Sequence, residues 1–460
     1  MISEIFFTST KENPLSTDSQ AKLQKTLGPL MLWGLGVGYV ISGMYFGWNL
    51  GLPQGGTLGM ALATGIVIIM YTTFTFSYTE LACSMPKAGG AFIYAHKALG
   101  PRWGFLGGMA QNIEFIFAPP AIAFAIGAYL DSIFPGHHAL TFAVISYFIF
   151  TFINILGVKL AATFELFVTV IAVIGLLLFS SLSIPHFEWE NFRQNALPNG
   201  YGGVFAALPF AIWFFLAIEG LANVAEETTN PQKNILLGFS SALITLVLLC
   251  LLTYFSSIGI QGWEAIVYKS GSTELSDAPL PLALQQILGK NSDLLKALVG
   301  IGLFGLIASF HGIILAAGRT TFEFGRMGYA PSFLGKIHPK YKTPALSLIV
   351  NMLIGIIALL TGKTGEIITI ACFGALTLYF ISMVSFFKLR KDSPTMPRPF
   401  KVMGYPYFPA IALILSLLCF VSMAVYNPTL FIIYLLLLFI PFLGFELFIY
   451  QRNKEAFSIN

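Results

Sequence analysis

Charge is scarce in this sequence. Of its 460 residues, only 10% are Asp, Glu, Lys or Arg, whereas 56% are hydrophobic, and the mean hydropathy is +0.78. Soluble domains carry roughly 25% charged residues, so this composition excludes a soluble globular protein. The net charge of +4 comes without a basic run interleaved with aromatic residues, so we expect no nucleic-acid partner.

Cysteine and catalytic motifs are scarce too. The four cysteines lie in or beside apolar segments, and their spacing suits neither a metal site nor a loop disulfide. No Ser/His/Asp, paired-Asp or HExxH arrangement falls within the apolar runs. We therefore expect no enzyme and no cofactor, with H⁺ or Na⁺ as the possible coupling ion. The cysteines are Cys83, Cys250, Cys372 and Cys419.

Long apolar runs occupy most of the chain. Lipid offers no partner for backbone polar groups, so segments that cross a membrane form helices or closed barrels, and these runs are continuous rather than alternating. We expect one all-α membrane domain of twelve helices over residues 29–451. The predicted spans are Pro29–Leu52, Thr57–Leu81, Arg102–Asp131, Ala139–Leu156, Val158–Ser181, Val204–Thr229, Asn234–Ile258, Asp293–Gly325, Pro344–Thr361, Glu366–Leu389, Tyr405–Tyr426 and Pro428–Tyr450.

The distribution of Lys and Arg predicts the orientation. With an even number of spans and the N-terminus inside, 20 of the 25 Lys and Arg residues face the cytoplasm, as the positive-inside rule requires. The polar residues 1–28 lack the apolar core of a signal peptide. We expect cytoplasmic tails over residues 1–28 and 452–460. The five outside residues are Arg193, Lys269, Lys290, Lys296 and Lys363.

Two spans carry residues that interrupt a helix. The first contains the string GLGVGYVISGMYFGWNLG (residues 34–51), with six glycines. Their spacing would suit close helix packing, or they mark an unwound segment near Ile41–Met44, because transporters unwind one helix in each half at the substrate site. In the sixth span, Glu219 and Gly220 interrupt the string WFFLAIEGLANVAEE. A break there would be the counterpart of the first.

Several strings resemble a known family. TELACSMPKAGGAFIYAHKALGP (Thr79–Pro101), VAEETTNPQ (Val224–Gln232) and GRTTFEFGRMGYAP (Gly318–Pro331) are similar to those of the amino acid-polyamine-organocation transporters. This resemblance covers nearly the whole chain. It implies two inverted five-helix repeats, 29–181 and 204–389, followed by two extra helices over 405–451. It also implies a substrate held between the first and sixth spans, and alternating access.

A narrower resemblance concerns the ethanolamine permeases. It rests on SGMYFGWNLGLPQGGTLGM (Ser42–Met60), NIEFIFAPPAIA (Asn112–Ala123) and AIEGLANVAEE (Ala217–Glu227). Ethanolamine is an ammonium and a hydroxyl on two carbons. Its site would need carbonyls or a carboxylate, aromatic faces and one hydrogen-bond partner for the hydroxyl.

Candidate binding residues follow from that chemistry. Glu114, midway along the third span, is a candidate counter-ion, because a carboxylate in lipid is costly enough to be functional unless it pairs with a neighbouring helix. Glu219 could bind the ammonium, carry a coupling proton or cap the unwound segment. The other substrate-binding candidates are Ile41, Ser42, Gly43, Met44 and Tyr45 at the first break, Trp213, Phe215, Leu216, Ala217 and Ile218 at the sixth, and His311 in the eighth span.

Three side chains are candidates for coupling or gating. They are Glu219, His311 and Glu165. A histidine in the cavity wall could titrate near neutral pH, although a neutral His311 bonded to a carbonyl is the simpler interpretation. Glu165, in the fifth span, could join a proton path, but no second sequence feature supports that role.

Together these features predict a permease of the cytoplasmic (inner) membrane. It would import ethanolamine or a close small organic amine, driven by an ion gradient or by exchange. The alternatives are an amino acid, GABA or polyamine permease or exchanger of the same superfamily, and a membrane sensor that transports nothing. The expected partners are the amine and the lipid bilayer, and the sequence predicts no oligomeric state.

Overall fold

The chain folds almost entirely into helices. The computed structural model describes residues 25–87, 89–134, 136, 138–269 and 271–451, with the side chains of 158–161 left aside. Among these residues no strand forms beyond two isolated β-bridges. The predicted tail over 452–460 and most of the tail over 1–28 lie outside the described residues.

Twelve spans cross the bundle, as the sequence predicts. Ten helices are long and apolar enough to cross a membrane, and the shorter Pro29–Tyr45 and Ala345–Leu359 bring the number to twelve. The spans in order are α2 with α3 (Pro29–Val40, Ser42–Tyr45), α4 (Leu52–Ser84), α6 (Pro101–Ile133), α7 (Ala139–Leu156), α8 (Val158–Ser183), α11 with η3 (Leu208–Trp213, Ile218–Glu227), α12 (Pro231–Ile258), α15 (Asp293–Arg326), α16 (Ala345–Leu359), α17 (Thr364–Asp392), α18 (Tyr407–Tyr426) and α19 with η4 (Pro428–Gly444, Phe445–Tyr450).

Short helices near the connections were not predicted as separate elements, although Trp48–Gly51 lies within the predicted first span and Gly200–Ala206 overlaps the start of the predicted sixth. They are too short or too amphipathic to register as apolar runs. Another difference concerns α4, which begins five residues before the predicted Thr57 because it includes a kinked first turn. At the kink Gly56 has φ 62°, and a Cβ there would lie 2.5 Å from the Ala196 carbonyl oxygen, so only glycine fits. The short helices are η1 (Trp48–Gly51), α5 (Ala91–Leu99), η2 (Ile184–His186), α9 (Trp189–Arg193), α10 (Gly200–Ala206), α13 (Glu264–Val267) and α14 (Pro279–Leu288).

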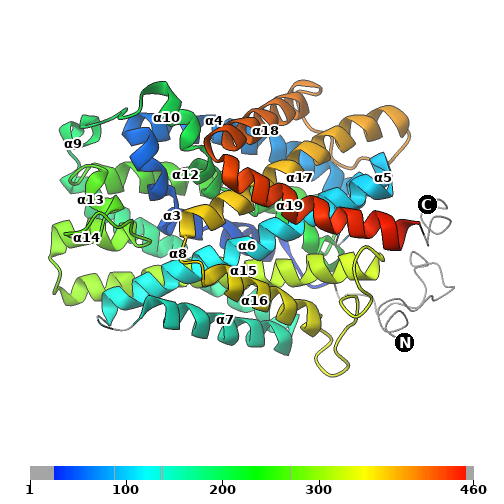
Figure 1. Ribbon diagram of the computed structural model, residues 1–460, viewed down its shortest axis with the longest axis horizontal. Helices are drawn as coiled ribbons and strands as arrows, with labels where there is room; N and C mark the ends of the chain where they lie inside the picture. Colours follow the sequence, from blue (N-terminus) through cyan, green and yellow to red (C-terminus); the bar gives the residue numbers. More distant parts are fainter. Residues whose placement is uncertain (1–24, 88, 135, 137, 270, 452–460) are drawn as a thin grey trace.

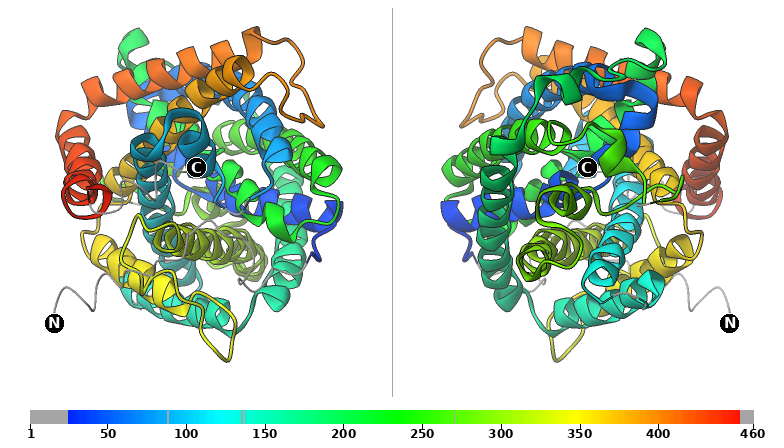
Figure 2. Two further views of the ribbon diagram at one scale, coloured as in Figure 1. Left: turned by 90° about the vertical axis from the view of Figure 1, so that its right-hand side faces the viewer. Right: turned by 90° about the vertical axis from the view of Figure 1, so that its left-hand side faces the viewer.

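Burial separates central from peripheral spans. The sixth span is 94% buried within its apolar window and α17 83%, whereas α18 and α19 are only 28% and 17% buried. Figures 1 and 2 show α18 and α19 on the outside of a rounded bundle. A helix that is apolar all round and still exposed is suited to face lipid. The last two spans are therefore peripheral, and the broken sixth span is central.

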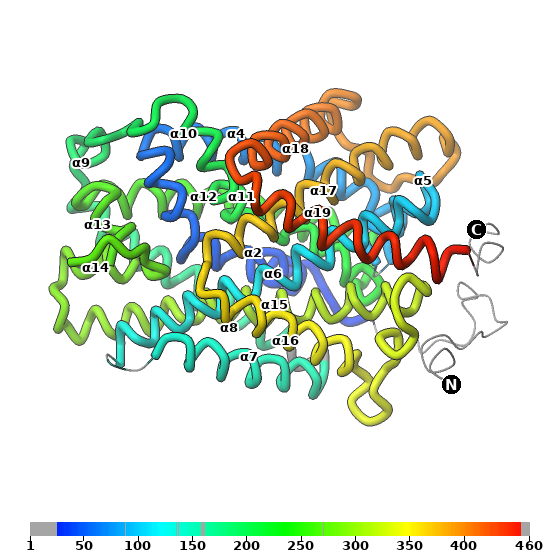
Figure 3. Tube along the Cα trace, in the orientation of Figure 1, coloured from blue at the N-terminus to red at the C-terminus, as the bar shows by residue number. Residues whose placement is uncertain are grey.

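The two ends of the bundle differ. Contacts join the beginnings of odd spans to the ends of even spans: Leu27 bridges to Thr228, and Arg102 pairs with Glu446. These contacts, with α5, lie at the end that holds the first and last described residues, while α9, α10, α13 and α14 lie at the opposite end (Figures 1 and 3). Because consecutive spans cross in opposite directions and their number is even, the first and last described residues lie at the same end. That the first of these ends is cytoplasmic remains a prediction from charge.

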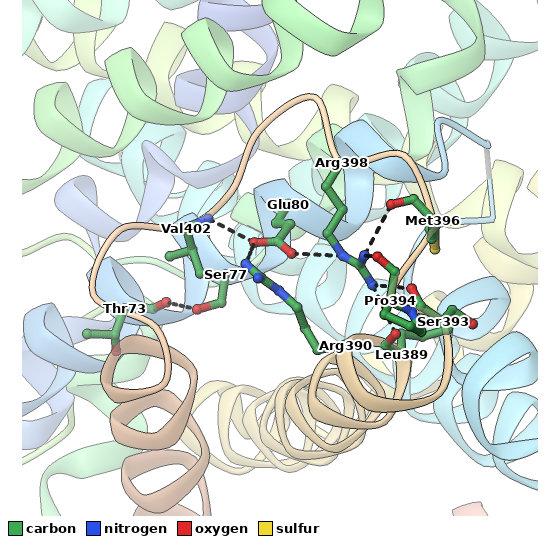
Figure 4. A network of polar contacts seen from close by, with 10 residues as sticks. All are labelled: Thr73, Ser77, Glu80, Leu389, Arg390, Ser393, Pro394, Met396, Arg398 and Val402. Atoms are coloured by element: carbon green, nitrogen blue, oxygen red, sulfur yellow. Dashed lines mark hydrogen bonds and ion pairs between the residues drawn. The ribbon is translucent and has the colours of Figure 1, made fainter.

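A buried ion cluster lies at the end of the bundle that holds the first and last described residues (Figure 4). We call it the Glu80 cluster: Glu80, Arg390, Arg398 and Val402. Glu80 lies near the end of α4 and is 1% exposed. Its Oε2 accepts hydrogen bonds from Arg390 Nη2 at 2.6 Å and from the Val402 N–H at 2.8 Å. Arg398 Nε lies 3.4 Å from Oε1, and its Nη2 donates to the Leu389 carbonyl at the end of α17. The cluster thus ties α4, α17 and the following loop together.

Candidate functional site

The first span opens at the predicted place. Ile41 interrupts the helix, and the Ser42 N–H, which would normally donate to the Gly38 carbonyl, instead donates to Ser309 Oγ at 2.8 Å. Ser309 Oγ donates in turn to the Gly38 carbonyl at 2.6 Å. A hydroxyl from α15 is thus inserted into the helical ladder. This Ser309 bridge satisfies two backbone groups that the break would leave unpaired.

The backbone leaves the helix slightly later than predicted. Ser42–Tyr45 is still helical, whereas Phe46 is extended and Gly47 has φ 87°. A Cβ at Gly47 would meet the Trp213 ring at 2.4 Å. Both the positive φ and this close approach require glycine. The interruption therefore runs from Ile41 to Gly47 rather than ending at Met44.

The sixth span breaks before Glu219, not at it. α11 ends at Trp213, residues 214–217 form turns, and Ala217 has φ 76°, a left-handed conformation rare for alanine. Such a residue costs about 1–3 kcal/mol and persists only where its surroundings impose it. A ten-residue 3₁₀ helix, η3, follows, far longer than such helices usually are. Glu219 therefore lies in the first turn after the break.

The two breaks touch. A Cβ at Gly43 would lie 2.5 Å from the Trp213 carbonyl oxygen and 3.0 Å from Phe214 Cα. The ring of Phe46 packs edge-on against that of Trp213, with centroids 5.4 Å apart. The unwound segments of the first and sixth spans thus form one buried centre, as the resemblance implies.

Gly43→Ala is expected to force these segments apart and abolish transport. The added methyl group would meet backbone atoms, which cannot swing away as a side chain could, so we expect a cost of about 1–3 kcal/mol. Thermal denaturation and substrate uptake measure the two effects. Gly65→Ala is the matched control, because a Cβ at Gly65 meets nothing within 4 Å. Full uptake by Gly43→Ala would contradict the close approach.

Two carboxyl groups meet beside the sixth-span break. Glu114 of α6 and Glu219 of η3 are each 0% exposed, and their side chains are within hydrogen-bonding reach of each other. The Ala217 backbone N–H lies near the Glu114 carboxyl, but of the four oxygens only Glu219 Oε2 accepts a hydrogen bond of regular geometry from a described residue. No described Lys, Arg or His forms an ion pair with either one. Two adjacent carboxylates away from water repel each other strongly. Either one of them takes up a proton or a cation binds beside them.

Aromatic side chains surround this acidic pair. The Tyr379 hydroxyl donates to Glu219 Oε2 at 2.8 Å and lies 3.0 Å from the Tyr71 hydroxyl. The Tyr71 ring lies 5.4 Å from that of Phe215, and the Phe74 ring 4.1 Å from that of Tyr379. Negative ring faces attract cations, and the hydroxyls can bond a second polar group. The centre thus combines features that suit an ammonium with an adjacent hydroxyl.

Comparison with known proteins identifies the family. The family model described as Amino acid permease matches residues 31–459. The chain belongs to the amino acid permease family, and so to the predicted superfamily. It is 27% identical to an uncharacterized transporter of Rhizobium meliloti (86% of each chain). It is 25% identical to the branched-chain amino acid permease BcaP of Bacillus subtilis (96% of each) and 27% to the low-affinity putrescine importer PlaP of Escherichia coli (86% and 88%).

These matches establish a multi-pass membrane transporter of small molecules. The family and the three relatives are named as transporters rather than enzymes, in line with the missing catalytic motifs. The names of these relatives concern branched-chain amino acids and putrescine, and none of the three mentions ethanolamine. Substrate choice in this permease must therefore be argued from its own residues.

A second acidic site of the permease lies nearby. Glu165 Oε2 of α8 is 2.9 Å from His311 Nδ1 of α15, and both side chains are fully buried. The partner of His311 is thus a carboxylate, not the carbonyl of the simpler interpretation. His311 Nε2 and Glu165 Oε1 meet no described hydrogen-bond partner. A Cβ at Gly38 would lie 2.2 Å from Glu165 Oε1, so this pair presses against the first span just before its break.

The predicted residues do not all gather at the acidic pair. Tyr45 points toward α8, where its hydroxyl donates to the Ala172 carbonyl at 2.7 Å. His311 lies beside Glu165. The Tyr39 ring approaches both Gly220, next to Glu219, and Gly312, next to His311, so Tyr39 lies between the two acidic sites. The remaining predicted residues lie along the two broken segments and are buried: Ile41, Ser42, Gly43, Met44, Trp213, Phe215, Leu216, Ala217 and Ile218.

Sequence reasoning missed three residues of the site. Tyr71 and Tyr379 are ordinary aromatic residues within apolar helices, and aromatics make up 15% of the chain. Ser309 is one of several small polar residues in α15. Only the fold brings these side chains to the breaks, and no local sequence signal could have singled them out.

Proposed function

We propose that this permease is a secondary transporter of a small cationic amine, ethanolamine or a close relative, and that Glu114 and Glu219 receive the ammonium. The observation that carries the proposal is the pair of adjacent buried carboxyl groups without a described basic partner. An ammonium supplies a charge and three donors. With one of the two carboxyl groups protonated, the ammonium would neutralise the remaining negative charge and donate to the oxygens that now accept no hydrogen bond.

The first-span break supports an amine over an amino acid. A substrate carboxylate would need free backbone N–H groups at a helix end. Several N–H groups at this break already donate within the protein. They are those of Ser42 to Ser309 Oγ, Met44 to the Ile41 carbonyl, Phe46 to the Ser42 carbonyl and Gly47 to Asn49 Oδ1.

A polyamine remains the strongest alternative substrate, because the similarity to a putrescine importer favours a cation as well. A panel of ligands distinguishes the candidates. Ethanolamine should raise the denaturation temperature of the purified permease, since a ligand that binds the native state stabilises it. It should also be taken up by proteoliposomes. Uptake resistant to excess branched-chain amino acid and to excess putrescine would support ethanolamine. Stabilisation by an amino acid or putrescine alone would overturn that assignment.

We further propose that a proton drives import and that the Glu165–His311 pair carries it. A buried carboxyl bonded to an imidazole can gain or lose a proton without a full charge being stranded. The pair lies against the first span, so its protonation can bias the break. In this proposal the permease lies in the inner membrane with both chain ends on the cytoplasmic side. Residues 29–181 and 204–389 form the two inverted repeats.

Glu165→Gln is expected to uncouple transport from the pH gradient. Glutamine keeps a hydrogen bond to His311 but cannot change its charge. The variant should still bind the amine and exchange labelled for unlabelled amine across vesicles. It should no longer accumulate amine when the outside is acidified. Accumulation driven by a Na⁺ gradient, or unchanged pH-driven accumulation in the variant, would refute proton transfer at this pair.

A further inference from the structure

A cavity of about 530 Å³ opens at the end of the bundle opposite the first and last described residues. Its wall is built from the outer parts of η1, α4, α11 and α17, the tips of α18 and α19, and the loop before α14. Charged and aromatic side chains line it: Asp277, Lys363, Glu366, Phe210 and Tyr426. The cavity is large enough for a small amine and lies apart from the acidic pair.

Asp277 is the carboxylate of this wall that lacks a basic partner. Its Oδ2 accepts a hydrogen bond from Thr364 Oγ1 at 3.0 Å, and it forms no ion pair with a described residue. The nearby basic groups are engaged elsewhere, because Lys363 pairs with Glu366 at 2.8 Å and Lys269 with Glu274 at 2.9 Å. The negative charge of Asp277 is therefore available to a cation in the cavity.

The loop that carries Asp277 is fastened to the first span. Asn49 of η1 is fully buried, and its Nδ2 donates to the Ser276 carbonyl at 2.8 Å. η1 directly continues the broken first span. Asp277 is thus held over the outer end of the first break rather than on a loop that is free to wander.

Helix α17 connects this cavity with the acidic pair. Its first residue, Thr364, bonds to Asp277, and further along Tyr379 bonds to Glu219. A Cβ at Gly374 would lie 2.9 Å from the Glu114 nitrogen. Ten residues of helix, from Thr364 to Gly374, span about 15 Å. The cavity and the acidic pair therefore lie along one helix, about three to four turns apart.

A layer of apolar side chains lies between the two sites. It contains Trp213 and Ile368, and we call it the Trp213 layer. At Gly47, a Cβ would meet both the Trp213 ring at 2.4 Å and Ile368 Cδ1 at 3.1 Å. Phe210, on the cavity wall, lies one turn before Trp213 on the same segment. Movement of this layer would connect the cavity with the centre.

We propose that this cavity is an outer binding site for the ammonium group of the substrate, with Asp277 as counter-ion and the rings of Phe210 and Tyr426 as its walls. The inference rests on the proposed function, since it takes the substrate to be a cationic amine. The amine occupies the outer site first and passes the Trp213 layer to reach Glu114 and Glu219. Asp277 is then a specificity-determining residue for entry.

The outer site is sensitive to pH. Burial raises the pKa of Asp277 to about 6, against the opposing effects of the Thr364 hydrogen bond and the Lys269 charge. The other charged groups that face the cavity are Lys363 and Glu366, which neutralise each other. Above pH 6 Asp277 is ionised and attracts the ammonium, and below pH 6 it gains a proton and the attraction is lost.

Asp277→Asn tests this proposal. In proteoliposomes at pH 7.5 the variant is expected to raise KM for ethanolamine about fivefold, the effect of about 1 kcal/mol for a partly exposed charge pair, with the maximal rate unchanged. The ratio of variant to wild-type KM should fall to one at pH 5. Asp277→Glu, which keeps the charge, should restore the wild-type KM. Asp293→Asn is the matched control, because Asp293 lies at the same end of the bundle but outside the cavity.

The outcomes separate the two proposals. A KM ratio of one at pH 7.5, or an equal rise in Asp293→Asn, overturns the outer site while amine transport stands. A KM rise that does not change with pH also overturns it, because the charge of Asp277 would then not matter. If the wild type neither binds nor carries ethanolamine, the proposed function fails, and the outer site fails with it.

Discussion

Glu219→Gln and Glu114→Gln are each expected to lower amine affinity about 100-fold, because removing one partner of a buried charge pair costs about 2–5 kcal/mol. Glutamine has nearly the same shape, and the Tyr379 hydroxyl can still donate to its carbonyl oxygen. The variants should therefore lose the rise in denaturation temperature that ethanolamine gives the wild type, and lose uptake.

Stability in the absence of amine distinguishes binding from folding. Each variant removes a buried carboxyl that has no described basic partner, so its denaturation temperature should equal or exceed that of the wild type. Glu165→Gln is the matched control, since it removes another fully buried carboxyl but is expected to keep amine binding. A lower denaturation temperature together with intact amine binding in Glu219→Gln or Glu114→Gln would show that these carboxyls are structural.

Glu80→Ala is expected to cause the largest loss of stability. Glu80 accepts from Arg390 and from the Val402 N–H and faces Arg398, which is only 7% exposed. Its removal would leave buried guanidinium charge uncompensated, at a cost of about 3–5 kcal/mol. Thermal denaturation in detergent should show a clear fall in transition temperature.

An exposed ion pair on α17, the helix that carries Arg390, provides the control. Asp392 pairs with Lys388 at 2.6 Å near the end of α17, with about half of each side chain exposed. Such surface pairs contribute about 0–1 kcal/mol, so Asp392→Asn should change the transition little. Equal losses in the two variants would mean that burial of the Glu80 cluster contributes nothing.

The spans could be predicted because the membrane imposes a simple pattern. α7 begins at Ala139 and ends at Leu156, the predicted residues, since its apolar run is bounded by polar residues and glycine. The helices α5 and α14 could not be predicted in this way, because amphipathic segments of nine and ten residues leave no long apolar run. Their existence depends on packing against the bundle.

The site was predictable in its charges and unpredictable in its geometry. Glu114 and Glu219 stand out because carboxylates are rare in apolar helices, and the fold places them together. The position of the break in the sixth span could not be predicted from the sequence. The left-handed residue is Ala217, whereas the sequence points to Gly220, three residues later. Tertiary contacts, not local preference, hold that alanine in place.

The Ser309 bridge determines which parts of the permease can slide past each other. Ser309 holds two short hydrogen bonds to the first span, at Gly38 and Ser42, in a fully buried place. If α15 slid along the inner half of the first span, the Gly38 carbonyl and the Ser42 N–H would both lose their hydrogen bonds to Ser309. Both groups would stay without a partner until water reached them. We therefore expect α2 and α15 to move together during transport. At its break the sixth span meets the first by close packing, and at its end the Glu227 carbonyl accepts hydrogen bonds from the Thr26 and Leu27 N–H groups.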